Sequence, residues 1–253
     1  MTTFTLTDWL TLEVYRTLLV FVRISAAFLL MPGFGEPTVP TRIRILAGLA
    51  VAVAVAPAVA GMPDTVPTTW SLIVAAAAEA VCGALLGTLA RTLISAVLMA
   101  GQVIGQNIAL SNIFATGVAV DQSATLGATL YAGIVAVMFA ANGHHAMLRA
   151  LVESYGLLPP GHFPEMAASA HAVVMAGLRS FRLGGELALP LLLLALVFHV
   201  ALGAVNRAMP AMPVFMIANP ALVMVGLYVL AATVPGIFDV GTAWWTALPS
   251  LLR

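Results

Sequence analysis

The chain has 253 residues, of which 62% are hydrophobic and 8% charged, and its ten acidic residues are balanced by ten arginines with no lysine. Ordinary soluble domains carry about 25% charged residues, so this composition, with a mean hydropathy of +1.06, is typical of an integral membrane protein. The net charge of zero and the lack of a basic run exclude a nucleic-acid-binding surface.

Long apolar runs separated by short breaks indicate membrane helices, because a helix needs about 20 residues to cross about 30 Å of hydrocarbon. The runs are too long and too rich in alanine and leucine for barrel strands. The sequence therefore predicts an all-α polytopic membrane protein of about six to eight helices in a single membrane-embedded domain, residues 1–253. Helices are expected at 10–31, 43–60, 70–90, 92–111, 124–151, 183–205 and 214–236, with a weaker one at 166–182.

Prolines and glycines predict where these helices break. Residues 31–40 hold three prolines and two glycines, so no helix can continue through them. The sequence 209–215 (MPAMPVF) is expected to stop another helix. The predicted break positions are Pro32, Pro40, Pro210, Pro213 and Pro220.

Charges in the expected loops suggest an orientation. If the runs span in turn, the arginine-bearing loops fall on one side of the membrane, as the positive-inside rule requires. This arrangement predicts an outer N-terminus and an inner C-terminus, although Arg207 breaks the alternation. The charges used are Arg42 and Arg44, Asp64, Arg91, Asp121, and then Arg149, Arg179 and Arg182, in the first to fifth loops.

Several polar residues lie inside or at the ends of apolar runs: Arg23, Glu79, Glu186, Asn206 and Arg207. An ionised group at a bilayer centre costs about 2.5–3.5 kcal/mol, so such groups usually face protein or water. They could form a proton or ion relay, or they could be paired or face a subunit interface. We favour pairing or an interface, because the sequence shows no ladder of carboxylates.

Small residues at a spacing of four recur in two helices, as Gly83 with Gly87 and Gly101 with Gly105. This pattern allows helix backbones to approach closely in a membrane. It predicts packing contacts and no particular chemistry.

The segment 111–125 interrupts two long helices with a mixed sequence that includes the bulky Ile113 and Phe114. It could be a simple connector. Alternatively, an apolar loop inside an assembly can block a water-filled path by steric closure and dewetting.

The sequence gives little support for a catalytic role. His144 and His145 are adjacent, but the sequence contains no H-E-x-x-H motif and no cysteine near them. A G-x-S-x-G motif and a glycine-rich phosphate loop are also missing from the sequence. We therefore expect no enzyme activity, no metal and no cofactor.

Five stretches in order resemble the FliR family, the R-type subunit of the flagellar type III export gate. Singly each is weak, but the ordered set is specific and extends over roughly residues 10–235. The stretches are 23–35 (RISAAFLLMPGFG) with 39–44 (VPTRIR), 101–106 (GQVIGQ) leading to Leu110 and Ser111, 139–144 (FAANGH), 187–190 (LALP) through 202–207 (LGAVNR), and 209–215 (MPAMPVF) with Pro220.

The resemblance implies a non-enzymatic subunit of the export gate in the bacterial inner membrane at the flagellar basal body. In that family one R-type copy completes a helical ring of P-type and Q-type subunits around an export channel, and much of the ring is raised towards the periplasm. Partners implied are these subunits, the B-type and A-type export proteins, membrane lipid and unfolded flagellar proteins. The alternating topology can therefore fail even if every helix is right.

The resemblance also suggests a plug. In the family, the loop after the Gly-x-x-x-Gly helix helps to close the channel, which assigns this role to 110–123 and to Ile113 and Phe114. The chain departs from the family by having Ala109 before the Leu-Ser pair, a single aromatic residue in the loop, and Asp121 followed by glutamine. The family's C-terminal helix break matches Asn206 and Arg207, which suggests an intersubunit contact there.

Two alternatives stay open on sequence grounds. The homologous subunit of a virulence injectisome shares the gate role, although the stretches 23–44 and 206–215 look more flagellar. A secondary transporter for small solutes would use Arg23, Glu79 and Glu186 as its coupling site, but it needs an internal repeat that the sequence does not show.

Overall fold

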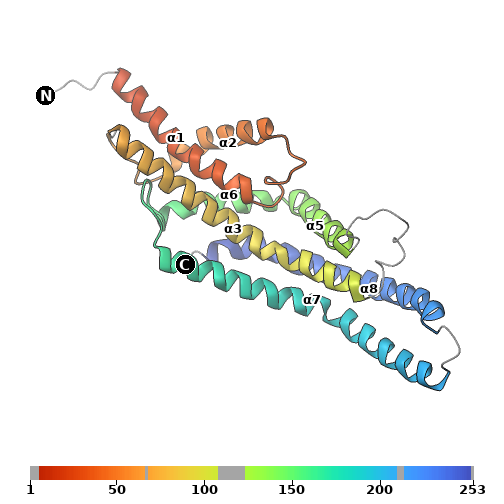
Figure 1. The fold of residues 1–253 in the computed structure, drawn as a ribbon. Helices are drawn as coiled ribbons and strands as arrows, with labels where there is room; N and C mark the ends of the chain where they lie inside the picture. Colours follow the sequence, from red (N-terminus) through yellow and green to blue (C-terminus); the bar gives the residue numbers. More distant parts are fainter. Residues whose placement is uncertain (1–5, 66–67, 108–122, 210–213, 252–253) are drawn as a thin grey trace. The chain divides into compact units, whose positions relative to one another are not determined.

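The computed structural model describes residues 6–65, 68–107, 123–209 and 214–251 (Figure 1). Over these residues the chain is helical and contains no β-strand, so the predicted all-α fold class is confirmed. The elements are α1 (Leu6–Leu30), α2 (Thr41–Val55), the 3-10 turn η1 (Ala56–Ala58), α3 (Thr69–Asn107), α5 (Ser123–Ala140), α6 (Gly143–Glu153), the 3-10 turn η2 (Ser154–Gly156), α7 (Met166–Ala208) and α8 (Val214–Leu251).

Two pairs of expected helices are in fact single helices. The runs predicted at 70–90 and 92–111 form one 39-residue helix, α3, and the runs at 166–182 and 183–205 form one 43-residue helix, α7. Arg91 and Arg182 stand at the two predicted boundaries, and both were expected to lie in loops. Both predicted breaks prove wrong, because arginine is a good helix former and neither residue is accompanied by proline.

The observed helix bounds also overturn most of the assignment of charges to loops. Arg91 lies inside α3, Arg149 lies inside α6, and Arg179 and Arg182 lie inside α7. The alternation of positive loops that supported an outer N-terminus therefore loses most of its basis.

One expected helix is divided instead. The run predicted at 124–151 breaks between α5 and α6, where Asn142 adopts the left-handed conformation with φ of 57°. Asparagine is among the few residues that tolerate this conformation, and Gly143 follows it at the start of α6.

Two of the predicted proline breaks are confirmed, and one is wrong. Pro32 lies two residues after the end of α1, and Pro40 caps the start of α2, as expected. The break predicted at Pro220 is wrong, because α8 continues through this residue, which is exposed. A proline removes one backbone hydrogen bond, and the rest of a long helix tolerates this loss. Pro210 and Pro213 lie outside the described residues.

The chain divides into two compact units. Unit 1 comprises residues 1–93, 142–177 and 245–253, and unit 2 comprises residues 94–141 and 178–244. In unit 1, α1 packs against α2, and Leu19, Ile24 and Phe28 of α1 are buried. In unit 2, Ile134 and Met138 of α5 are buried, as is Leu191 of α7.

Four helices or helix segments are long and apolar enough to cross a membrane, namely Thr41–Ala58, Thr69–Asn107, Met166–Ala208 and Ala218–Gly241. The number rises to five if the broken pair α5 and α6 counts as one span. These numbers refer to the residues that the structure describes. The polytopic membrane character is confirmed, whereas α1, which carries Glu13, Arg16 and Arg23, is not among the candidate spans.

Candidate functional site

A buried ion pair lies at the centre of unit 1. Arg23 of α1 and Glu79 of α3 have no exposed side-chain surface. The Nε of Arg23 donates to Oε2 of Glu79 at 2.6 Å, and Nη2 donates to Oε1 at 3.2 Å, so one edge of the guanidinium binds both carboxylate oxygens. The sequence had left open whether these charged residues form a relay, pair with one another or face a subunit interface, and the structure pairs Arg23 with Glu79.

The segment after α6 completes the hydrogen bonding of this pair. Nη1 of Arg23 donates to the Ser154 hydroxyl at 3.2 Å, and Nη2 donates to the Leu158 carbonyl at 3.0 Å. The Gly161 amide donates to Oε1 of Glu79 at 2.7 Å. The two charges are thus met by backbone groups as well as by each other, which is the condition under which a buried ion pair is tolerated.

Tyr155 closes the remaining side of the network. Its ring lies under the guanidinium, with the Cζ of Arg23 3.7 Å from the ring centroid, a cation–π arrangement. Its hydroxyl donates to Oε2 of Glu79 at 3.4 Å. The network therefore ties α1, α3 and residues 154–161 together within unit 1.

Glycines let α3 approach α1 beside this pair. A side chain at Gly83 would collide with the backbone carbonyl of Arg23, and one at Gly87 would come within 2.7 Å of the carbonyl of Ala27. The spacing of four thus matches one turn of each helix. The pattern that predicted close packing here brings Glu79 within reach of Arg23.

A second close approach lies in unit 2, between α3 and α5. A side chain at Gly101 would collide with the Cα of Gly127, and one at Gly127 would come within 2.7 Å of the carbonyl of Leu98. The sequence had singled out Gly101 and Gly105 but not Gly127, because α5 has no second glycine four residues from it. This crossing brings together the two helices that precede and follow residues 108–122.

The other polar candidates do not join the buried pair. Glu186 lies in unit 2, where its Oε1 accepts from Nε of Arg182 at 2.8 Å, and both side chains are exposed. Asn206 and Arg207 are exposed at the C-terminal end of α7. Glu186 is thus paired within α7 and Glu79 with Arg23, so neither carboxylate is an unpaired group of the kind that a coupling site would need.

The plug candidates Ile113 and Phe114 lie outside the described residues. Among the described residues, His, Cys, Asp and Glu do not gather into a group of three or more that could hold a metal ion. His144 and His145 begin α6, with their ring centroids 4.1 Å apart.

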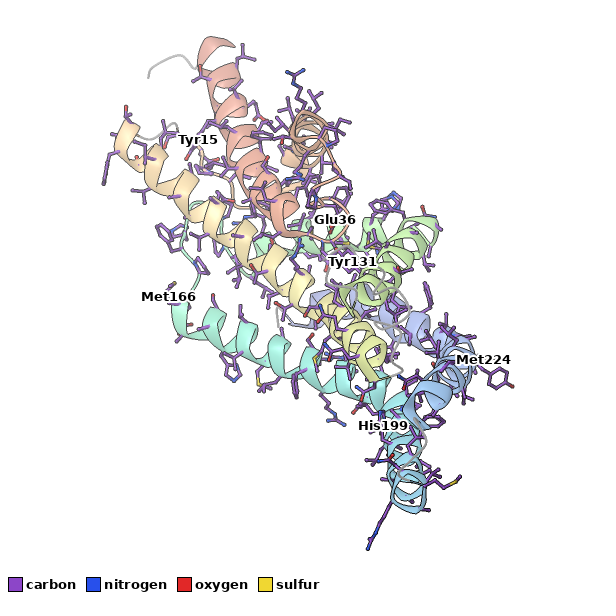
Figure 2. All side chains as sticks on the ribbon, turned by 45° about the vertical axis from the view of Figure 1, so that its right-hand side comes forward. Tyr15, Glu36, Tyr131, Met166, His199 and Met224 are labelled. Carbon is purple, nitrogen blue, oxygen red and sulfur yellow. The ribbon has the colours of Figure 1, made fainter. Side chains whose placement is uncertain are left out.

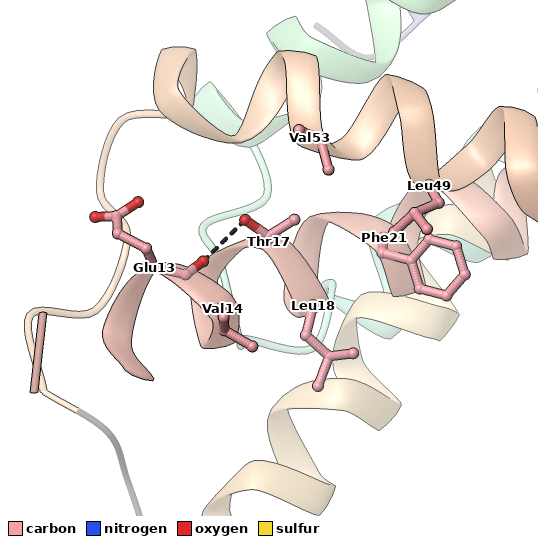
Figure 3. Close-up of a pocket in the computed structure, with 7 residues that line it drawn as sticks. All are labelled: Glu13, Val14, Thr17, Leu18, Phe21, Leu49 and Val53. Carbon is pink, nitrogen blue, oxygen red and sulfur yellow. Dashed lines mark hydrogen bonds between the residues drawn. The ribbon is translucent and has the colours of Figure 1, made fainter. Parts of the chain in front are cut away.

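An apolar pocket of about 350 Å³ opens between α1 and α2 in unit 1 (Figure 3). The Thr17 hydroxyl at its edge donates to the Glu13 carbonyl at 2.8 Å, and the Glu13 carboxylate accepts from Arg16 at 2.9 Å. Because these polar groups already have partners, the pocket offers mainly apolar contact. Its apolar lining consists of Val14, Leu18, Phe21, Leu49 and Val53.

Sequence reasoning identified both charges of the buried network but missed the groups that complete it. Leu158 and Gly161 contribute backbone atoms, for which side-chain patterns give no signal. Ser154 and Tyr155 could have been suspected, because they stand beside the Leu-Pro-Pro-Gly break at 158–161, where a chain turns back on itself. Nothing in their own spacing connects them to Arg23.

Comparison with known proteins adds the functional context. Residues 14–248 match the family described as bacterial export proteins, family 1. A flagellar biosynthetic protein FliR of Caulobacter vibrioides is 34% identical over 233 residues, which are 91% of this chain and 92% of that protein. A protein of the same name from Aquifex aeolicus is 35% identical over 42% of this chain and 41% of its own length. One from Escherichia coli is 37% identical over 37% of this chain and 36% of its own length.

Proposed function

Because the chain belongs to the bacterial export proteins, family 1, and is a multi-pass inner-membrane subunit of the flagellar type III export apparatus, we propose that it helps to form and seal the export channel. The family match over residues 14–248 carries this proposal, since it includes both units and the segment between α3 and α5. The expected flagellar assignment is confirmed, and the injectisome alternative is not favoured.

We propose a structural and gating role without catalysis for this subunit. The polar network around Arg23 and Glu79 is closed to solvent, and its charged groups have hydrogen-bond partners within the chain. A carboxylate that accepts hydrogen bonds from a guanidinium and a backbone amide is well suited to hold α1, α3 and residues 154–161 together. Because it is buried, it is poorly placed to contact a substrate. Unfolded flagellar proteins would pass along the assembled channel, and energy for transport would come from other components.

The assembly partners proposed for this chain are the P-type and Q-type subunits, with the B-type and A-type export proteins nearby. The apolar helices support this idea, because many of their large side chains remain exposed, including Ile43 and Leu46 of α2 and Met224 of α8. Sister subunits or lipid must cover such side chains. We further propose that the two units act as a single membrane-embedded domain, since α3 and α7 each run from one unit into the other.

The plug proposed for the closed channel is residues 110–123, with Ile113 and Phe114 as the blocking side chains. Support comes from the family resemblance and from the crossing of Gly101 with Gly127, which holds the helices on either side of this segment together. Bulky apolar side chains in a narrow passage exclude water and ions.

The test is ion leak in cells that make the whole gate with Ile113→Gly and Phe114→Gly combined. Removal of both side chains should increase the leak, measured as loss of membrane potential or as growth inhibition by added salt. The matched control is Val118→Gly with Val120→Gly, which shortens two apolar side chains of the same segment. Equal leak in parent and double variant, with normal gate assembly, would leave the segment as a simple connector.

A further inference from the structure

Helix α7 is too long to lie wholly within a bilayer. Its 43 residues extend about 64 Å at 1.5 Å per residue, roughly twice the 30 Å of hydrocarbon. Part of α7 must therefore leave the hydrocarbon, and the position of its charges shows where.

The C-terminal half of α7 has the length of one membrane crossing. Residues 187–206 carry no charged side chain and are bounded by Glu186 and Arg207, a stretch of about 20 residues that fits the hydrocarbon. Met166 marks the start of α7 and His199 lies within this apolar half (Figure 2). The boundary at Glu186 therefore coincides with one expected edge of the hydrocarbon.

Three charged side chains lie on one face of α7 at this boundary. Arg179, Arg182 and Glu186 are spaced at i, i+3 and i+7, and all three are exposed. The opposite face packs against α3, where the hydroxyls of Ser180 and Ser95 lie 3.0 Å apart. The charged face is thus directed away from α3. It carries a net positive charge, because it has two arginines and one carboxylate.

The backbone at this boundary is compatible with polar surroundings. Pro190 lies inside α7 and has no N–H, so the carbonyl of Glu186 cannot accept the usual helical hydrogen bond from position 190. An unpaired carbonyl in hydrocarbon costs several kcal/mol, whereas water or a lipid headgroup can supply a donor. A position of Glu186 at the level of headgroups, which the side-chain charges indicate, would give this carbonyl such a donor.

An exposed apolar stripe begins next to the charges and continues along α7. Its members, Leu189, Leu193, Leu196 and Val200, follow the helical spacing of four and three, and each is at least half exposed. The stripe is about 17 Å long, close to half of the hydrocarbon thickness and so to one leaflet. A polar head followed by an apolar strip of this length has the shape of one phospholipid molecule.

We propose that Arg179 and Arg182 bind the phosphate of an anionic phospholipid whose acyl chain lies along the stripe of α7. Arginine suits this role, since its planar fork donates to phosphate oxygens from two nitrogens. An acidic partner protein is disfavoured, because the surface that continues from the arginines is uncharged over residues 187–206. This proposal does not depend on the plug or on the partner subunits.

The test is a titration of the full chain in mild detergent with phosphatidylglycerol, with retained lipid measured by native mass spectrometry. Each arginine near an anionic lipid surface contributes about fivefold in affinity, so Arg179→Gln with Arg182→Gln should weaken binding about twenty-five-fold. The control is Arg149→Gln, an exposed arginine of α6 in unit 1, which should leave binding unchanged. Glu186→Gln should strengthen binding about twofold, because Arg182 then loses its competing carboxylate.

Three further measurements show whether the bound phosphate belongs to a lipid and whether a loss of binding reflects the missing arginines or a misfolded protein. Arg179→Lys with Arg182→Lys should retain most of the binding, and circular dichroism should show unchanged helix content in all variants. Phosphatidylcholine should be retained much less than phosphatidylglycerol, and inorganic phosphate at millimolar concentration should not displace the lipid. Equal binding by parent and glutamine variant, equal retention of the two lipids, or displacement by free phosphate would each overturn the proposal.

Discussion

The two units contain ion pairs of the same chemical type in opposite settings. In unit 1, Arg23 and Glu79 are fully buried, and backbone and hydroxyl groups meet their remaining hydrogen-bonding needs. In unit 2, Arg182 and Glu186 are neighbours on the surface of a single helix, with 82% and 53% of their side chains exposed. The difference shows that the role of a charged residue in an apolar run cannot be assigned until its interaction partners are known.

Burial decides what each pair can do. A buried pair that loses one member leaves an uncompensated charge, whereas an exposed pair that loses one member exchanges it for water. The pair in unit 1 is therefore structural, and the pair in unit 2 is available for contacts outside the chain.

The largest effect is expected from Glu79→Gln, which keeps the shape of the side chain and removes its charge. Arg23 would then be buried without a counter-charge, at a cost of about 3–5 kcal/mol of folding free energy. Thermal unfolding in mild detergent, followed by circular dichroism, measures the change.

A companion variant separates charge from packing. Arg23→Met with Glu79→Leu replaces the whole pair by apolar groups of similar size and should recover most of the stability lost in Glu79→Gln. A double variant as unstable as the single one would show that the hydrogen bonds to residues 154–161, not the missing counter-charge, dominate.

A smaller effect is expected from alanine at the glycine crossings. Gly83→Ala in unit 1 and Gly127→Ala in unit 2 each force two backbones apart, which should destabilise the protein by about 1–3 kcal/mol. The same unfolding measurement applies to both, with Gly105→Ala, the other glycine named by the sequence pattern, as a third test.

The matched controls are Gly177→Ala in α7 of unit 1 and Gly203→Ala in α7 of unit 2, where an added Cβ meets nothing within 4 Å. Alanine in an open helical position should stabilise by about 0.5–1 kcal/mol. If crossing and control variants behaved alike, helix propensity and not close approach would explain the glycines.

The smallest effect is expected from Glu186→Gln, which disrupts the exposed pair on α7. Water and headgroups can solvate Arg182, so the unfolding midpoint should stay unchanged while Glu79→Gln lowers it strongly. A loss of stability comparable to that of Glu79→Gln would contradict the contrast between the two units.

The sequence predicted the features that depend on local signals. The proline-rich stretch 31–40 separates α1 from α2, and Gly83 and Gly87 mark a real crossing of helices. Both follow from short-range sterics, namely the missing N–H of proline and the missing Cβ of glycine.

The sequence could not predict features that depend on tertiary partners. Arg91 was interpreted as a loop residue, but a single arginine neither breaks a helix nor fixes a membrane boundary. Glu186 and Glu79 look alike in the sequence, since each is an acidic residue in an apolar run. Only the fold shows that Glu79 is buried and Glu186 is exposed. Gly161 contributes an amide to Glu79 from 82 residues away, for which a sequence pattern gives no sign.

The central claim is that this chain is a subunit of a heteromeric export gate. The most direct measurement is co-expression with its cognate P-type and Q-type proteins, purification in mild detergent and native mass spectrometry of the product. The account predicts one copy of this chain in a large complex that contains both partners. A lone, stable monomer or homodimer, found with both partners present and folded, would contradict it.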